Sequence, residues 1–233
     1  MITLRPSAER GHGDYGWLDT RYSFSFANYF DRKHMGFRDL RVINEDWISA
    51  GEGFGSHPHK DMEILTYIVD GELSHRDSTG REATIRPNDV QRMSAGTGVV
   101  HSEYNNSNAP VHLLQIWIMP EANGLPASYE DRTFRREEKL NQLRLIASRD
   151  GRHDSTRINQ DASVYASVLD GDKSLQHALE PDRHAWLQLI KGELSLNGTK
   201  VAMGDGVAIS GESKLQIANT GDGEAEFLLF DLN

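Results

Sequence analysis

Two stretches of this chain repeat one hairpin in nearly the same residues, and this repetition constrains the fold more than any other feature. Gly71-Glu-Leu-Ser recurs as Gly192-Glu-Leu-Ser, 121 residues later. Asn88-Asp89-Val90 resembles Gly204-Asp205-Gly206 at a spacing of 116, and residues 113–117 resemble 227–231 at a spacing of 114. Three landmarks in one order, each separated by about half the chain length, predict two copies of one β unit.

Short apolar runs bounded by glycine, asparagine and aspartate dominate the chain, and helix signals are scarce. The runs are rich in Ile, Val, Tyr, Phe and Trp, which is typical of strands in an all-β sandwich or barrel. They lie at residues 40–43, 63–69, 111–119, 185–190 and 227–232. We therefore expect two β domains, residues 1–130 and 146–233, joined by a charged linker at 131–145 with one short helix around 135–143.

The composition excludes several classes of function. The chain has no cysteine, so any metal must be held by nitrogen and oxygen ligands. A net charge of −10 argues against binding to nucleic acid or anionic membranes, and we expect Arg132, Arg135 and Arg136 to form only a solvated face. No apolar run approaches the ~20 residues of a membrane span, and the first residues lack the pattern of a secretory signal. We expect a cytoplasmic protein.

Three of the ten histidines lie in a recognisable frame of glycines. The stretch from Gly51 to Gly71 contains His57-Pro-His59 and Glu63, and it fits the first cupin signature with one extra residue before Gly71. The stretch Gly98-Val-Val-His101-Ser-Glu103 fits the second cupin signature. Together with the repeat, these signatures predict a bicupin, which consists of two tandem jelly-roll-type β-barrels joined by a short linker.

The spacing of these residues predicts a metal site. Residues two apart on a strand point to the same face, so His57 projects with His59, and His101 with Glu103. Adjacent strands facing a barrel interior can converge all four on one divalent ion, for which Fe, Mn, Co, Ni, Cu and Zn are all suitable. An octahedral ion with four protein ligands keeps two positions open, as catalysis requires. Glu63 shares the parity of His59, so spacing alone leaves Glu63 and Glu103 as rival ligands.

The other histidines are not expected to bind metal. His75 and His112 lie on predicted strands and are expected to serve structure, whereas His12, His34 and His153 are expected in loops. The repeat spacings place Ala178 and Glu180 at the positions of His57 and His59, and His184 at that of Glu63. They place Leu215 or Ile217 at His101, and Ile217 or Asn219 at Glu103. His177 lies nearby, but no ligand set remains, so we expect the second copy to be a metal-free support domain.

Five stretches of the first half carry a resemblance to a known family. They are Ser23-Phe-Ser-Phe-Ala-Asn-Tyr-Phe-Asp, Leu40-Arg-Val-Ile-Asn, Gly55-Ser-His-Pro-His-Lys-Asp-Met-Glu63, His75-Arg-Asp-Ser and Met93-Ser-Ala-Gly-Thr-Gly-Val-Val-His-Ser-Glu103. These stretches resemble the pirin family, and its bacterial quercetinase members above all. The resemblance implies one divalent metal in the N-terminal barrel, held by His57, His59, His101 and Glu103. It favours Glu103 over Glu63, which would then orient a histidine ligand.

The activity implied by the resemblance is that of a quercetin 2,3-dioxygenase, which opens the central ring of a flavonol with O2 and releases carbon monoxide. We expect Glu103 to be catalytic by taking the proton of the flavonol 3-hydroxyl. The implied partners are a flavonol-like aromatic substrate and O2. Two alternatives stay open: a metal-bearing regulator that acts through protein contacts, as eukaryotic relatives do, and a cupin enzyme with another substrate. The complete ligand set favours an enzyme.

Overall fold

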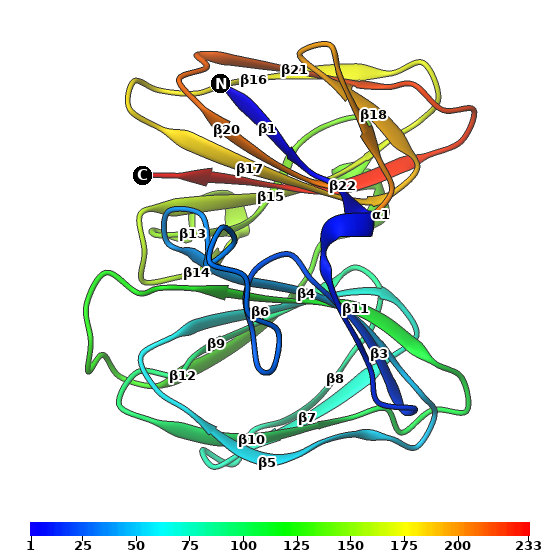
Figure 1. Cartoon of the computed structure of the whole chain (residues 1–233). Helices are drawn as coiled ribbons and strands as arrows, with labels where there is room; N and C mark the ends of the chain where they lie inside the picture. Colours follow the sequence, from blue (N-terminus) through cyan, green and yellow to red (C-terminus); the bar gives the residue numbers. More distant parts are fainter. The chain divides into compact units, whose positions relative to one another are not determined.

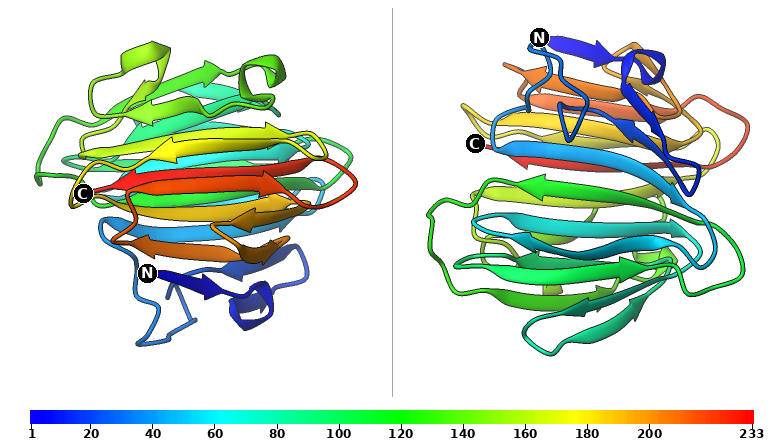
Figure 2. Two further views of the ribbon diagram at one scale, coloured as in Figure 1. Left: turned by 90° about the horizontal axis from the view of Figure 1, so that it is seen from above. Right: turned by 60° about the horizontal axis from the view of Figure 1, so that its bottom comes forward.

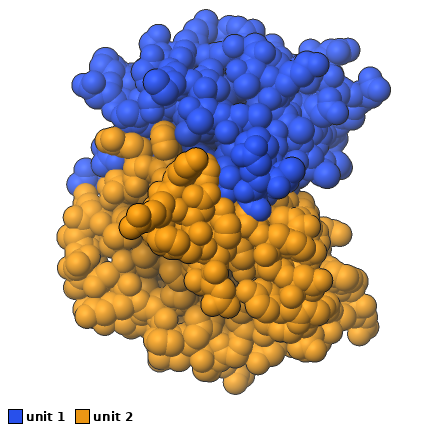
Figure 3. All heavy atoms as spheres, viewed as in Figure 1, with its two compact units in different colours: residues 1–10, 134–155, 161–233 blue, residues 11–133, 156–160 orange.

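The computed structural model describes residues 1–233, and the contacts within the chain divide it into two compact units (Figure 3). Unit 2 contains residues 11–133 and 156–160, and unit 1 contains residues 1–10, 134–155 and 161–233. Antiparallel strands build both units, and the only α-helix, α1 (Arg136–Lys139), has four residues. The all-β prediction is confirmed. No helix in the structure has both the length and the hydropathy needed to cross a bilayer.

Unit 2 consists of two antiparallel sheets that lie in layers (Figure 1). The larger sheet has the strand order β12-β9-β6-β11-β4-β3-β2, and the smaller one has the order β5-β10-β7-β8. The strands are β2 (Gly11–Asp14), β3 (Leu18–Tyr22), β4 (Leu40–Ile48), β5 (Gly53–His59), β6 (Glu63–Asp70), β7 (Leu73–Asp77), β8 (Glu82–Ile85), β9 (Asp89–Ser94), β10 (Val99–Tyr104), β11 (Val111–Ile118) and β12 (Ser128–Thr133).

Unit 1 is built in the same way. One sheet runs β1-β20-β17-β22-β15-β13, and the other runs β16-β21-β18-β19. The elements are β1 (Ile2–Arg5), β13 (Arg144–Ser148), β15 (Ala162–Leu169), β16 (Ser174–Ala178), β17 (His184–Lys191), β18 (Glu193–Leu196), β19 (Thr199–Ala202), β20 (Gly206–Ser210), β21 (Lys214–Asn219) and β22 (Ala225–Leu232), with 3-10 turns η1 (Ser7–Glu9) and η2 (Arg152–Asp154). The short strand β14 (Thr156–Arg157) belongs to the residues that group with unit 2.

The two units share one topology, which confirms the prediction of a duplicated β unit. The order β5-β10-β7-β8 of unit 2 returns as β16-β21-β18-β19, and β9-β6-β11-β4 returns as β20-β17-β22-β15. The repeated hairpin glycines have one physical cause in both units. Gly71 and Gly192 have φ values of 81° and 83°, and a Cβ would lie 2.9 Å from the Pro110 carbonyl oxygen and 2.5 Å from that of Glu224. Only glycine fits both demands.

The edge strands β1 and β12 are the elements that the sequence-based division places differently. β1 precedes the first copy in the chain, yet it lies beside β20 in unit 1 (Figure 2) and pairs with it, with Ile2 opposite Ile209. β12 pairs with β9 in unit 2, and it extends to residue 133 where the linker was expected to have begun. The helix expected over 135–143 is a single turn, because Leu140 is extended and Asn141 has a φ of 55°.

A layer of polar side chains separates two apolar clusters inside unit 2. One cluster contains Leu18, Ile48, Ile68, Leu73, Ile85, Val111 and Leu113, and the other contains Ile64, Met93, Ala95 and Val99. The inward positions of β6 are Ile64, Thr66 and Ile68, so Thr66 lies between the clusters. Gln115 holds the same place on β11, and the Thr66 hydroxyl donates to its side-chain oxygen at 2.8 Å. The candidate site lies in this polar layer.

Candidate metal centre

Three histidine side chains converge in unit 2. The Nε2 atoms of His57 and His101 are 3.0 Å apart, and the ring centroids of His59 lie 4.8 Å from those of both other rings. One ligand nitrogen from each of the three rings lies within 4.8 Å of the others. A triad of imidazoles gathered in this way indicates a metal site.

The register of two neighbouring strands explains why these rings meet. β5 and β10 pair with His57 opposite His101 and His59 opposite Val99. His57 and His59 are two residues apart and therefore share one face of β5. On β10 the burial alternates, so that Val99, His101 and Glu103 are buried while Val100 and Tyr104 are exposed. The pairing shifts between His101 and Glu103, as a β-bulge does.

Burial keeps two rings of the triad, those of His59 and His101, neutral. Burial, reinforced by His57, lowers the pKa of His59 to about 4. Burial, reinforced by the neighbouring histidines 57, 59 and 75, lowers the pKa of His101 to about 2. A neutral imidazole offers a nitrogen lone pair, which is the form that binds a metal.

Glu103 is the fourth residue that the sequence placed in the site. Its carboxylate is buried, with Oε2 accepting a hydrogen bond from Gln115 Nε2 at 3.1 Å. Oε1 has no partner in hydrogen-bonding geometry, although the side-chain amide of Gln91 lies near the carboxylate. Burial raises the pKa of Glu103 to about 7, against the effect of the Gln115 hydrogen bond. Its carboxylate lies within 4.8 Å of ligand nitrogens of His75 and His101. A buried oxygen without a partner is costly unless something binds it.

The donor set fits a transition-metal ion. Nitrogens bound to one octahedral ion at about 2.1 Å and at right angles lie roughly 3.0 Å apart, and the Nε2 atoms of His57 and His101 have that separation. Imidazole nitrogens with one carboxylate oxygen suit divalent first-row metals. The unpartnered Oε1 of Glu103 supplies a further donor atom within the same polar layer.

Glu63, the rival of Glu103 by spacing, has both carboxylate oxygens engaged elsewhere. Its Oε2 accepts from the Ser94 hydroxyl at 2.7 Å, and its Oε1 accepts from Asn159 Nδ2 at 3.0 Å. It belongs to neither of the two clusters of metal-binding side chains. These contacts give Glu63 a structural explanation that requires no metal.

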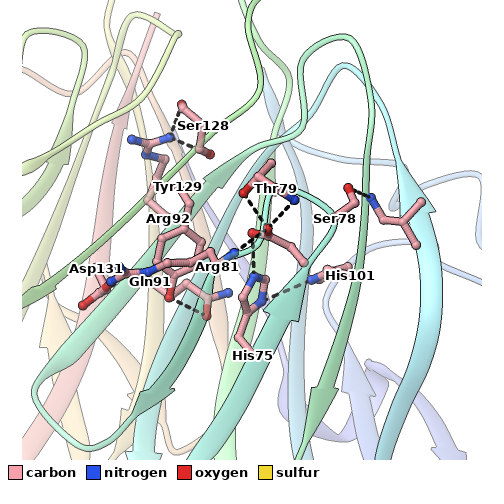
Figure 4. A network of polar contacts seen from close by, with 12 residues as sticks. His75, Ser78, Thr79, Arg81, Gln91, Arg92, His101, Ser128, Tyr129 and Asp131 are labelled. Carbon is pink, nitrogen blue, oxygen red and sulfur yellow. Dashed lines mark hydrogen bonds and ion pairs between the residues drawn. The ribbon is translucent and has the colours of Figure 1, made fainter.

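His75 is the residue that the sequence reasoning kept apart from the site. It lies on β7 as expected, but its Nδ1 is 3.4 Å from Nδ1 of His101 (Figure 4), and its Nε2 is 3.1 Å from Oδ2 of Asp77. The signal that could have found it is the alternation His75-x-Asp77 on the strand that pairs with β10. There His75 lies opposite Glu103, and Asp77 lies opposite His101.

The remaining histidines lie apart from the cluster. His112 lies on β11 as predicted, where it stacks on Trp47 and its Nε2 lies 3.0 Å from Glu45. His34 and His153 lie outside strands, in agreement with the sequence reasoning. His12 was expected in a loop, and this expectation is wrong, because His12 lies on β2, where it pairs with Arg21 of β3.

The second copy keeps one histidine of the set. His177 lies opposite Leu215 in the β16–β21 pair, as His57 lies opposite His101. This register corrects the alignment based on the 121-residue spacing, which had placed Ala178 at His57. The segment from this histidine to the hairpin glycine is one residue longer in unit 1 (177–192) than in unit 2 (57–71). The counterparts of His59, His101 and Glu103 are buried aliphatic residues, which are Leu179, Leu215 and Ile217. No metal-binding cluster is found in unit 1.

Comparisons with known proteins agree with this architecture. The Pirin family profile matches residues 3–118, and the profile of the quercetinase C-terminal cupin domain matches residues 145–232. Together with the shared topology of the two units, these matches confirm the bicupin prediction.

Relatives extend the likeness over the full chain. A quercetin 2,3-dioxygenase of Escherichia coli K12 is 47% identical over 100% of this chain and 99% of its own length. A pirin-like protein of Caulobacter vibrioides is 36% identical over 99% of both chains. The crystal structure of the bacterial pirin YhhW from Escherichia coli in complex with nickel(II) is 47% identical. It has a TM-score of 0.94, covering 100% of this chain and 99% of that one.

Proposed function

The chain belongs to the pirin family, and from this premise we propose that it is a metal-dependent dioxygenase that cleaves a flavonol such as quercetin with O2 and releases carbon monoxide. The observation that carries the proposal is the histidine triad beside the unpartnered oxygen of Glu103. The 47% full-length identity to a quercetin 2,3-dioxygenase supports the choice of substrate.

The proposed ligands are His57, His59, His101 and Glu103, which would hold one divalent transition-metal ion. Ni(II) is the first ion to test, because the bacterial pirin YhhW was solved with it. When bound, such an ion supplies Lewis acidity and open positions for exogenous ligands. The chain's own contribution is to present neutral imidazoles in a fixed register and to leave one carboxylate oxygen unengaged.

A cavity next to the triad supports an aromatic substrate. It has a volume of about 230 Å³, and aromatic side chains make up half of its lining, with two aliphatic and three polar residues: Tyr15, Trp17, Leu18, Thr20, Tyr22, Phe26, Ala27, Asn44, Asp46 and Phe54. Phe54 joins the cavity to the triad, because its ring lies 6.3 Å from that of His57. Phe26 lies 5.1 Å from Trp117, whose ring is 4.9 Å from that of His59. Apolar walls with a few polar groups are typical of small-molecule sites.

Glu103 is the proposed base. The protein itself engages only one oxygen of this carboxylate, so the other is available first to the metal and then to the proton of the flavonol 3-hydroxyl. Burial, which raises the pKa of Glu103 to about 7, makes the carboxylate a stronger base than an exposed one. Gln115 holds the other oxygen, and Thr66 orients Gln115 by donating to its side-chain oxygen. The polar layer thereby keeps the base in one orientation.

The test combines metal analysis with turnover. Protein purified from its native host should contain about one equivalent of a divalent transition metal, and an anaerobic flavonol titration should shift the flavonol absorbance. After O2 is admitted, the mixture of protein and flavonol should take up oxygen and release carbon monoxide. A metal-free protein with no spectral shift contradicts the proposal, whereas a shift without oxygen uptake favours a metal-bearing regulator. A panel of substrates, compared by rate, distinguishes flavonols from other substrates of a cupin enzyme.

The Glu103→Gln variant tests the base. It should keep its metal in part and lose turnover by about 10²–10⁴-fold, which is the usual contribution of a general base. His177→Gln is the matched control, because it changes a histidine of the other unit that lies in a carboxylate pair. Unchanged turnover of Glu103→Gln would remove the carboxylate from the mechanism.

A further inference from the structure

A buried histidine–aspartate pair, His75 and Asp77, lies against the second ring nitrogen of His101, and Figure 4 shows His75 facing that ring. His101 directs Nε2 toward His57 and Nδ1 toward Nδ1 of His75, at 3.4 Å. His75 directs its other nitrogen, Nε2, toward Oδ2 of Asp77 at 3.1 Å. The side chains of His75 and Asp77 are 0% and 1% exposed, so water does not compete for these contacts.

The turn after β7 fixes the orientation of the Asp77 carboxylate. Its Oδ1 accepts hydrogen bonds from the backbone N–H of Thr79 at 2.8 Å and from the Thr79 hydroxyl at 2.6 Å. The backbone N–H of Arg81 reaches the same oxygen at 3.3 Å. Burial opposes ionisation, yet the hydrogen bonds from Thr79 and His75 hold the pKa of this carboxyl below its usual value. Asp77 therefore offers Oδ2 to His75 as a hydrogen-bond acceptor.

We propose that His75 and Asp77 are positioning residues that set the tautomer and the ring orientation of His101. The Asp77 carboxylate accepts a hydrogen bond from Nε2–H of His75, so Nδ1 of His75 carries a lone pair. That lone pair accepts a hydrogen bond from Nδ1–H of His101, so Nε2 of His101 is unprotonated and directed into the triad. The inference rests on the proposed metal site and names the residues that prepare one of its ligands.

The far side of the triad is prepared in a matching way. His57 Nδ1 lies 2.7 Å from the Gly55 carbonyl oxygen, which can only accept, so this nitrogen carries the proton. The Nε2 lone pair of His57 consequently faces that of His101 at 3.0 Å. Two lone pairs at this distance repel unless a cation lies between them. The carbonyl on one side and the His75–Asp77 pair on the other thus prepare both rings for a metal.

The tautomers can be read directly in the unmodified protein. Nitrogen-15 NMR of histidine-labelled, Zn(II)-loaded protein distinguishes protonated from unprotonated ring nitrogens, and the missing signals of a His75→Gln variant assign His75. We expect the proton on Nε2 of His75 and on Nδ1 of both His101 and His57. A His75 ring protonated at Nδ1 overturns the proposal; the ring states are those of the unmodified protein, and the variant serves only to assign them.

Asp77→Asn is the most informative variant, because asparagine has the shape of aspartate but presents a hydrogen-bond donor to His75 where aspartate presents an acceptor. The three donors on Oδ1 require the amide oxygen at that position, so the amide NH2 faces His75 and becomes a donor. The proton of His75 is then forced onto Nδ1, against the Nδ1–H of His101. We expect Ni(II) affinity, measured by competition with a chelator, to fall about 10- to 100-fold. The visible spectrum of the Co(II)-loaded protein should change as well, since it reports the ligand set.

Asp231→Asn is the matched control in unit 1. Asp231 Oδ2 lies 3.1 Å from His177 Nε2, so the pair repeats the aspartate–histidine contact without a second imidazole behind it. This variant should leave Ni(II) affinity unchanged. Equal affinity and equal spectra for Asp77→Asn and Asp231→Asn overturn the role of Asp77. Failure of the unmodified protein to bind Ni(II), Co(II) or Zn(II) instead overturns the metal site on which the inference rests.

Discussion

The interiors of the two units differ although their strand orders agree. In unit 2 Thr66 of β6 lies opposite Gln91 and Gln115 on its two neighbouring strands. At the corresponding place in unit 1, Leu187 of β17 lies opposite Val207 and Leu229. The polar layer of unit 2 is therefore replaced by aliphatic side chains, and unit 1 has one continuous apolar cluster of 15 buried residues.

This difference teaches how one fold separates chemistry from stability. Buried polar groups cost free energy unless they are paired, and unit 2 keeps some that are not, such as Oε1 of Glu103. Unit 1 has replaced three of its four counterparts of the proposed ligands with leucine and isoleucine, which bury apolar area at no such cost. The duplicated topology is thus compatible with a reactive interior or with a purely apolar one.

The largest effect should come from giving unit 2 a residue of unit 1. His101→Leu puts into the triad the residue type that unit 1 has at this place, where Leu215 lies, and removes a proposed ligand. We expect turnover at background and a loss of Ni(II) affinity of roughly 100-fold or more, since four ligands share on the order of 10 kcal/mol. Calorimetric titration measures the affinity. His177→Leu is the control in unit 1, and equal losses in both variants would contradict a single site in unit 2.

The reverse exchange should cost stability. Leu215 is fully buried in the apolar cluster of unit 1, where a histidine would find no prepared partner. We expect Leu215→His to lower the free energy of unfolding by about 2–5 kcal/mol, because an imidazole of similar volume but another shape packs poorly there and buries unpaired polar nitrogens. Denaturant titration measures this loss. Gln216→His, exposed on the same strand, is the control, and a Leu215→His loss no larger than the control's would show that the interior of unit 1 tolerates the polar layer.

Much of this comparison could be predicted from the sequence, because both fold and site rest on short-range patterns. The hairpin glycines at 71 and 192 require positive φ, and strand alternation places His101 and Glu103 on one face. What failed depended on register across strands. The one-residue shift that puts His177 at the place of His57 is visible only in the pairing with Leu215. The pairing of β1 with β20 joins residues about 200 positions apart, beyond the reach of local patterns.

The contact of His75 with His101 could not be predicted from the sequence, for a related reason. Its position on a strand was predicted, but nothing local says which strand lies beside β10. Once β7 is placed there, His75 and Asp77 must face the site, because they alternate with exposed Arg76. Topology therefore supplied what periodicity could not.

A smaller and more selective effect should separate the two glutamates. Glu63→Gln keeps one acceptor oxygen but sets an amide group against a donor from Ser94 or Asn159. We expect the free energy of unfolding to fall by about 1–2 kcal/mol, the usual value of one buried hydrogen bond, with Ni(II) affinity unchanged. Thermal unfolding and chelator competition, run on the same preparation, measure the two quantities. A loss of affinity matching that of Glu103→Gln would make Glu63 a ligand.

The smallest effect should be a change in how the free energy of unfolding depends on acidic pH, caused by a residue of unit 1. Although burial opposes ionisation, hydrogen bonds from His177 and Arg183 hold the pKa of Asp231 below its usual value. The folded state thus binds fewer protons than the unfolded state near the usual pKa of the group. This contribution to stability is present above the unfolded pKa and is lost as the pH falls through the folded pKa.

Asp231→Asn should therefore flatten the dependence of the free energy of unfolding on pH below about pH 4. The change in slope cannot exceed the effect of one proton, about 1.4 kcal/mol per pH unit. Denaturant titrations at a series of acidic pH values measure it. Asp161→Asn is the control, because Asp161 is bound by the same arginine but is 53% exposed, and exposed pairs contribute little. An unchanged slope in Asp231→Asn would mean that the aspartate–histidine pair of unit 1 adds nothing to its acid stability. The presence of the His75–Asp77 pair in unit 2 would then be explained by its contact with the His101 ring alone.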